Sequence, residues 1–249
     1  MATQTVSGRP GAGVRPSGRA SERGGHEGGA SKRWLRENGL TIALLAFFFA
    51  SLVGQGLAGY RLLNEELAEH GQAALSFGAY LISGHFIESV FENWESEFLQ
   101  MAAFVLFTVW LRQKGSPESN PLEEKAGAEG GGAEERSAEA PWPVRRGGLV
   151  KAVYSHSLTI ALTLLFLGSF ALHAAGGVRE HNREQALHGG GAASFFEYLG
   201  TSKFWFQSFQ NWQSEFFSVA VLVVLTVFLR EKGSAQSKEV AAPHRETGE

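Results

Sequence analysis

The chain contains no cysteine. A disulfide framework, a thiolate zinc site and a thiol nucleophile are therefore excluded. The common catalytic signatures are also missing: a phosphate-binding loop, an HExxH pair, a nucleophile elbow and a dinucleotide fingerprint. We accordingly expect no catalytic residue, no cofactor and no metal site, and we expect that the chain is not an enzyme.

A strong net charge is missing as well. The 249 residues carry a formal net charge of -3, which gives no electrostatic basis for a nucleic-acid partner. Apolar residues are concentrated in four blocks, and the rest of the chain is rich in Gly, Glu, Arg and Ser. This distribution predicts membrane helices separated by polar segments rather than a soluble domain.

The first apolar block, 40–60, has 21 residues and no charge. A helix of this length spans about 31 Å, which is enough to cross the hydrocarbon core of a bilayer. Lys32, Arg33 and Arg36 precede it, so a signal peptide with small residues near 56–59 is the alternative interpretation. The length of the run and a counterpart deep in the chain favour a membrane helix.

The segments between the blocks are polar. Residues 61–70 are predicted to prolong the first helix until Gly71, and 76–86 to form a short amphipathic helix on the membrane surface. Three segments have no pattern for a core and are predicted to be disordered: 1–33, 116–146 and 235–249.

The two halves of the chain are similar at a constant offset of 212 − 94 = 118 positions, the distance between Trp94 and Trp212. Residues 38–116 align with 156–234 without a gap, and 35 of the 79 pairs are identical. This pattern predicts an internal duplication with two membrane helices in each half. The predicted membrane repeats are 34–115, with spans at about 40–60 and 92–111, and 147–234, with spans at about 157–176 and 210–229.

Two helices in each half return the chain to its starting side. The repeats are therefore expected to be parallel and related by a pseudo-two-fold axis along the membrane normal. Lys and Arg gather near both termini and the linker, which places these segments in the cytoplasm. The predicted fold class is an all-α integral membrane protein with four transmembrane helices, short interfacial helices, and disordered tails and linker.

A polar segment bearing Trp leads into the second helix of each half. Glu97 precedes Leu111 by 14 residues, or about 21 Å of helix, which places its carboxylate inside the bilayer near the outer edge. Helical spacing places the neighbouring polar residues on the same face in both halves. The predicted polar seam comprises Asn93, Glu97, Gln100, Asn211, Glu215 and Ser218.

Several roles fit this seam. Glu97 and Glu215 are expected first to pack or anchor helices, second to line an ion or proton path, and last to take part in catalysis. Trp94 and Trp212 are predicted to be anchors at the membrane interface.

Other residues differ between the halves. His173 and His181 occur in one copy only, whereas His70 and His188 recur before a glycine, which predicts helix C-terminal capping rather than metal binding. A third face of the second helix is acidic in one copy only, so the duplicated structure does not require its charge. It carries Glu88, Glu92 and Glu95 in the first copy and Phe206, Gln210 and Gln213 in the second.

The segments NGLTIALL, EHGQ, FENWESEFLQMAAFVLFTVWLRQKGS and FWFQSFQNWQSEF resemble an uncharacterised family of small bacterial multi-pass membrane proteins, a domain of unknown function. The resemblance covers roughly residues 34–234 and leaves the linker and both tails outside. It implies a bacterial inner-membrane protein with a duplicated two-helix unit, and it implies no activity.

Two classes of function remain. The first is a structural or interaction component of the inner (plasma) membrane, with the lipid bilayer and a second copy or another membrane protein as partners. The missing motifs and the shallow carboxylates favour it. The alternative is a small-ion or proton channel or transporter in which Glu97 and Glu215 pair across the pseudo-two-fold axis.

Overall fold

The computed structural model describes residues 32–121 and 140–247. Most of the predicted disordered tail 1–33 and much of the predicted linker 116–146 lie outside these residues. The chain divides into two compact units, 1–57 and 58–249. The regular elements of the described residues are helices, with no strand among them: α2 (Gly39–Glu69), α3 (Phe77–Leu81), α4 (Gly84–Trp110), α6 (Trp142–Arg146), α7 (Gly148–Ser155), α8 (Ser157–Leu187), α9 (Phe195–Leu199) and α10 (Ser202–Phe228).

The bounds of α8, α9 and α10 follow those of α2, α3 and α4 at the predicted offset, since 157 − 39, 195 − 77 and 202 − 84 all equal 118. Equivalent hydrogen bonds accompany them. The backbone N–H of Leu75 donates to Asn64 Oδ1 over 2.7 Å, and that of Ala193 donates to Asn182 Oδ1 over the same distance. The predicted extension of the first helix is confirmed, because α2 runs to Glu69. The short helices α6 and α7 were not predicted.

Three of the described helices, α2, α8 and α10, are long and apolar enough to cross a membrane. The sequence predicted four such helices. The predicted span at 92–111 falls in α4, whose N-terminal half carries four glutamates, so that α4 has no long stretch that is apolar enough to count as a span. These glutamates lie at positions 88, 92, 95 and 97.

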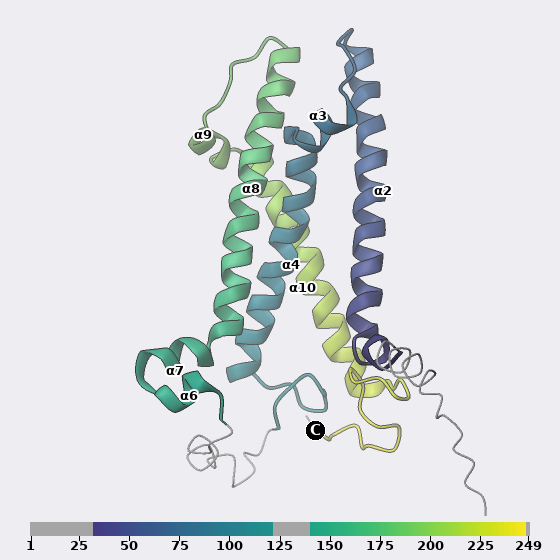
Figure 1. Cartoon of the computed structure of the whole chain (residues 1–249), viewed down its shortest axis with the longest axis vertical. Coiled ribbons are helices and arrows are strands. Elements are labelled where there is room, and N and C mark those ends of the chain that lie inside the picture. Colours follow the sequence, from purple (N-terminus) through teal and green to yellow (C-terminus); the bar gives the residue numbers. More distant parts are fainter. Residues whose placement is uncertain (1–31, 122–139, 248–249) are drawn as a thin grey trace, which may run out of the picture. The chain divides into compact units, whose positions relative to one another are not determined.

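The helix α4 packs along α8 and also contacts α10 (Figure 1). Glycines bring the backbones of α4 and α8 together. A Cβ at Gly84 would lie 2.6 Å from the backbone N of Glu180, and a Cβ at Gly176 would overlap the backbone of Glu88. Small residues thus allow α4 and α8 to cross in backbone contact, as in closely packed membrane helices.

The short helices α3 and α9 each place one tyrosine inside the protein. Tyr80 is buried against Leu63 and Leu67 of α2, and Tyr198 is buried beside Ala174 and Phe204. The prediction of a short helix within 76–86 is confirmed. Its position at the membrane surface stays a prediction.

The C-terminal segment 235–247, predicted to be disordered, consists of turns in the structure. The Lys238 ammonium donates hydrogen bonds to the backbone oxygens of Pro243, His244 and Glu246 over 3.1–3.3 Å. The buried Lys238 ammonium therefore provides hydrogen bonds for three backbone carbonyls. The composition of this segment did not predict these contacts.

Candidate functional site

The helix α4 presents an acidic face to its neighbours. Glu88, Glu92 and Glu95 are spaced by four and three residues, so they lie on one side of the helix. Glu88 is 5% exposed and Glu95 is 0% exposed. This acidic face occurs in only one of the two halves, so the duplication does not require its charge. It is nevertheless a face that the protein buries.

Glu95 lies at the centre of this face. Its Oε2 is 2.7 Å from Nδ1 of His173 on α8, and its Oε1 accepts a 2.9 Å hydrogen bond from the indole N–H of Trp212 on α10. A carboxylate accepts the hydrogen bond, so Nδ1 of His173 is the donor, and Nε2 is the other nitrogen of the ring. This Nε2 is buried, has no hydrogen-bond partner among the described residues, and lies 3.9 Å from Oε2 of Glu92.

Neutral donors hold the other two carboxylates. The side-chain amide of Gln207 donates to Glu88 Oε1 over 2.8 Å, and the amide of Asn211 donates to Glu92 Oε1 over 3.2 Å. The Tyr198 hydroxyl also donates to Glu88 Oε1, over 3.3 Å. Burial and then the Glu88 charge raise the pKa of Tyr198 far above its ordinary value, so this hydroxyl keeps its proton.

No lysine or arginine of the described segments forms an ion pair with Glu88, Glu92 or Glu95. Lys203 pairs with Glu184 over 2.8 Å, and Arg183 bridges two other glutamates. Burying carboxylates without an opposite charge is costly. The polar contacts of these carboxylates come instead from neutral side chains and from the ring of His173.

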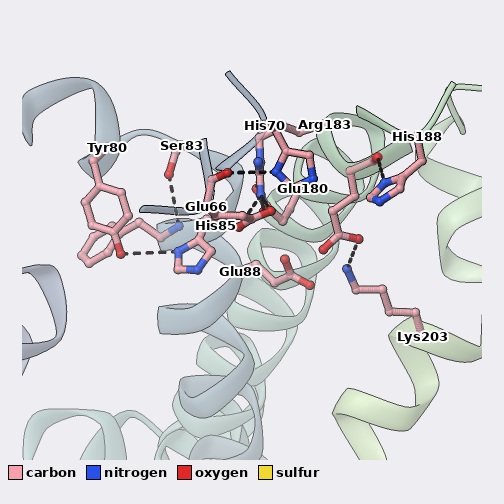
Figure 2. A network of polar contacts seen from close by, with 12 residues as sticks. Glu66, His70, Tyr80, Ser83, His85, Glu88, Glu180, Arg183, His188 and Lys203 are labelled. Carbon is pink, nitrogen blue, oxygen red and sulfur yellow. Dashed lines mark hydrogen bonds and ion pairs between the residues drawn. The ribbon is translucent and has the colours of Figure 1, made fainter. Parts of the chain in front are cut away.

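An open cavity of about 370 Å³ is bordered by Glu88 and Glu92 of this group. In Figure 2 Glu88 lies between His85 on one side and Lys203 on the other, with Arg183 and Glu180 above it. Acidic residues dominate the lining, which comprises Glu66, His85, Glu88, Ser89, Glu92, Glu180, Glu184, Lys203 and Gln207.

A second cavity, of about 360 Å³, opens between α4 and α10 farther along. Its lining includes Gln100 and Thr108 among apolar side chains such as Phe104 and Val219. Glu92 borders the first cavity and Gln100 borders the second, and the two residues are about 12 Å apart along the helix. Only a short stretch of α4 therefore separates the two cavities.

The predicted seam is partly brought together. Asn211 binds Glu92, and Glu97 lies within electrostatic range of Glu215, its counterpart in the other half. Gln100 lines the second cavity. The remaining members bond within their own helices: Asn93 donates to the backbone oxygen of Ser89, and Ser218 to that of Glu215.

The two predicted interfacial tryptophans differ in their surroundings. The N–H of Trp212, which an anchor would offer to lipid headgroups, is bonded to Glu95 inside the protein. Trp94 packs against Phe91 and Phe98 with ring centroids 5.1 and 6.5 Å away. The anchoring role of both residues stays a prediction.

The sequence analysis missed the central residues, and differences between the halves were the signal that could have found them. At the offset of 118, His173 stands opposite Gln55, and Glu95 stands opposite Gln213. The same comparison sets Arg183 opposite Glu65. The charged interior is thus built at positions where the halves diverge, because one copy supplies the acids and the other supplies the histidine.

Glu88, Glu92 and His173 could hold a metal ion, since one ligand atom from each lies within 4.8 Å of the others. The sequence analysis expected no metal site. For the recurring histidines, the predicted capping is confirmed: Nδ1 of His70 and of His188 bond the backbone oxygens of Glu66 and Glu184 over 2.9 and 2.8 Å.

Long apolar helices around buried polar side chains are the features of a helical membrane protein. The chain belongs to the DUF6766 family, a domain of unknown function whose match covers residues 31–249. The match includes the linker and the C-terminal segment, which the resemblance seen in the sequence left outside. Neither the curated proteins nor the solved structures gave a match.

Proposed function

We propose that the protein is an integral membrane protein that passes small cations through the polar centre formed by α4, α8 and α10. The observation that supports this function is the group of Glu88, Glu92 and Glu95, two of them buried and none paired with a lysine or arginine of the described segments; Glu88 and Glu92 border an acidic cavity. Ionisable residues at membrane depth are rare and usually serve ion pathways.

The polar contacts continue along α10. Gln207, Asn211 and Glu215 recur every four residues and form one stripe on that helix. Gln207 meets Glu88, Asn211 meets Glu92, and Glu215 approaches Glu97. A cation entering the first cavity therefore meets oxygen ligands in succession toward Gln100 and the second cavity.

The proposal treats α4 as a fourth membrane helix. Its polar face needs no contact with lipid, because α8 and α10 cover it. The equal bounds of the two sets of helices support a duplicated unit. With two spans in each unit, the repeats are parallel, both termini are cytoplasmic, and the membrane is the bacterial inner membrane.

The role of a structural or interaction component stays a prediction. Helix packing alone gives no reason to bury Glu88 without a lysine, arginine or histidine partner, because apolar residues of similar volume pack at lower cost. The polar centre therefore favours ion passage over a purely structural role.

Ion flux into liposomes that contain the purified full chain tests the proposal. Na⁺, K⁺, H⁺ and Mn²⁺ are offered in turn, and the parent is compared with Glu92→Gln and with Glu97→Gln/Glu215→Gln. Glu69→Gln, an exposed change at the end of α2, is the matched control. We expect Glu92→Gln to reduce flux about tenfold or more and Glu69→Gln to leave it unchanged. Absence of flux in the folded, inserted parent would overturn the proposal.

A further inference from the structure

The unpartnered nitrogen of His173 points into the acidic group. The imidazole is completely enclosed, with its ring centroid 4.9 Å from that of Phe204. Its Nδ1 is bound to Glu95, and its Nε2 faces Oε2 of Glu92 at 3.9 Å. The buried Nε2 and the carboxylate oxygen thus face each other with no hydrogen bond between them, and a cation held between them would contact both.

We propose that Glu88, Glu92 and His173 form a binding site for a divalent first-row transition ion. The inference rests on the proposed function in one respect, because it names the class of cation that occupies the same polar centre. The site itself requires only binding, so it can be tested without any measurement of flux.

The distances suit an ion of this size. Zn²⁺ lies about 2.0–2.2 Å from imidazole nitrogen and carboxylate oxygen, so two of its ligand atoms are at most about 4.4 Å apart. The 3.9 Å between His173 Nε2 and Glu92 Oε2 is within that limit. The ligand atom of Glu88 is within 4.8 Å of both, and a small rotation of its side chain brings it to the ion.

The ligand types select the class of metal. One imidazole and two carboxylates suit Zn²⁺, Mn²⁺ or Fe²⁺. Ca²⁺ takes six to eight oxygen ligands, and Mg²⁺ keeps several of its waters, so a nitrogen-containing set of three is a poor site for either. The three protein ligands leave further coordination positions toward the open cavity, through which the ion enters.

A second layer of hydrogen bonds holds each ligand. Glu95 fixes the tautomer and the direction of His173, and Trp212 in turn holds Glu95. Gln207 and Asn211 each hold one oxygen of Glu88 and Glu92. Metal sites in proteins depend on such outer contacts, whose loss typically weakens binding about 10–100-fold.

One other pair of histidines needs control. His70 and His188 are exposed, with ring centroids 5.9 Å apart, and surface histidines collect added metal. Binding is therefore measured in a His70→Gln/His188→Gln background. Any ion retained there is not held by the surface pair.

The test uses the full chain in detergent, stripped with a chelator and titrated with Zn²⁺ and Mn²⁺, with Ca²⁺ for comparison. Bound metal is counted by elemental analysis, and affinity is measured by calorimetry. We expect one Zn²⁺ per chain, about hundredfold weaker binding in His173→Gln and Glu92→Gln, and about 10–100-fold weaker binding in Glu95→Gln. Glu69→Gln, an exposed change at the end of α2, is the control and keeps full affinity.

Circular dichroism and gel filtration establish that each variant is folded. If His173→Gln does not fold, Glu92→Asp decides, because it keeps the charge while withdrawing the ligand oxygen, and weakened binding supports the site. The inference is overturned if the stripped parent binds no added Zn²⁺ or Mn²⁺. Equal affinity in the parent and the Glu92 variants would also overturn it. Metal binding without flux would preserve this site and overturn the proposed function, whereas flux of monovalent cations without metal binding would do the reverse.

Discussion

The imidazole of His173 and the carboxylate of Glu95 are both fully buried and lie 2.7 Å apart across the contact between α8 and α4. Each side chain supplies the hydrogen-bond partner that the other needs. Trp212 adds a donor from α10, so three helices meet at one carboxylate. The loss of either partner leaves a polar group without compensation in the interior.

Glu95→Leu and His173→Leu are each expected to destabilise the folded protein by about 3–5 kcal/mol, because one buried group then loses its partner. The double variant is expected to recover most of that loss, since apolar pairs of similar volume often replace buried polar pairs without cost. Unfolding in mixed detergent micelles, analysed as a double-mutant cycle, measures the coupling. Losses that simply add in the double variant would show that the two side chains act independently.

Gly176→Leu is expected to separate α4 from α8, because the new side chain would enter space that the backbone of Glu88 occupies. Overpacking at such contacts costs about 1–3 kcal/mol. Gly168→Leu is the control: it lies on the same helix, and nothing is within 4 Å of its Cβ position. Thermal unfolding in detergent compares the two, and equal losses of stability would contradict the close crossing.

Arg183 joins α2 to α8 by pairing with Glu66 over 3.0 Å and with Glu180 over 2.6 Å. Arg183→Met is expected to lower stability by about 1–3 kcal/mol, because the buried Glu180 then keeps its charge without a partner. Arg179→Met, an exposed change four residues earlier, serves for comparison. The rate of hydrogen exchange near the end of α2 should rise in Arg183→Met and not in Arg179→Met. An unchanged rate in Arg183→Met would show that the Arg183 ion pairs do not hold α2 to α8.

Much of the fold could be read from the sequence because hydrophobic runs and the offset of 118 act locally. They predicted the C-terminal ends of α2 and α4 within a few residues, because Gly71 marks a turn and the predicted span 92–111 ends one residue beyond Trp110. The number of spans was harder. Hydropathy is summed along a single helix, so the glutamates of α4 lower its value. In the structure α8 and α10 pack against α4 and cover these glutamates, which a sum along one helix does not take into account.

The candidate site was missed for a related reason. The comparison of the halves gave weight to what they share, such as Glu97 and Glu215, but a site assembled between two unequal copies depends on where they differ. Glu95 and His173 come from opposite halves, so no local spacing joins them. Only the packing of α4 on α8 makes them neighbours, and the sequence alone did not show which faces meet.

Tyr80 should make the protein sensitive to alkali. Burial, followed by the charge of Glu180, raises the pKa of the Tyr80 hydroxyl above its ordinary value of about 10. A raised pKa in the folded state gives stability that is fully present below the pKa of the unfolded chain and is lost as the pH rises toward the folded value. The other titratable group against this hydroxyl is His85, whose Nδ1 lies 3.4 Å from it.

Tyr80→Phe removes the titrating group and keeps the ring against Leu63 and Leu67. We expect its stability to fall less steeply than that of the parent between about pH 10 and pH 12, because one fewer proton is released on unfolding in that range. Tyr154→Phe, at an exposed position of α7, is the matched control and should follow the parent. Melting temperatures across this range measure the slopes. Parallel curves for the parent and Tyr80→Phe would mean that the Tyr80 hydroxyl titrates as in water and is not held inside the protein.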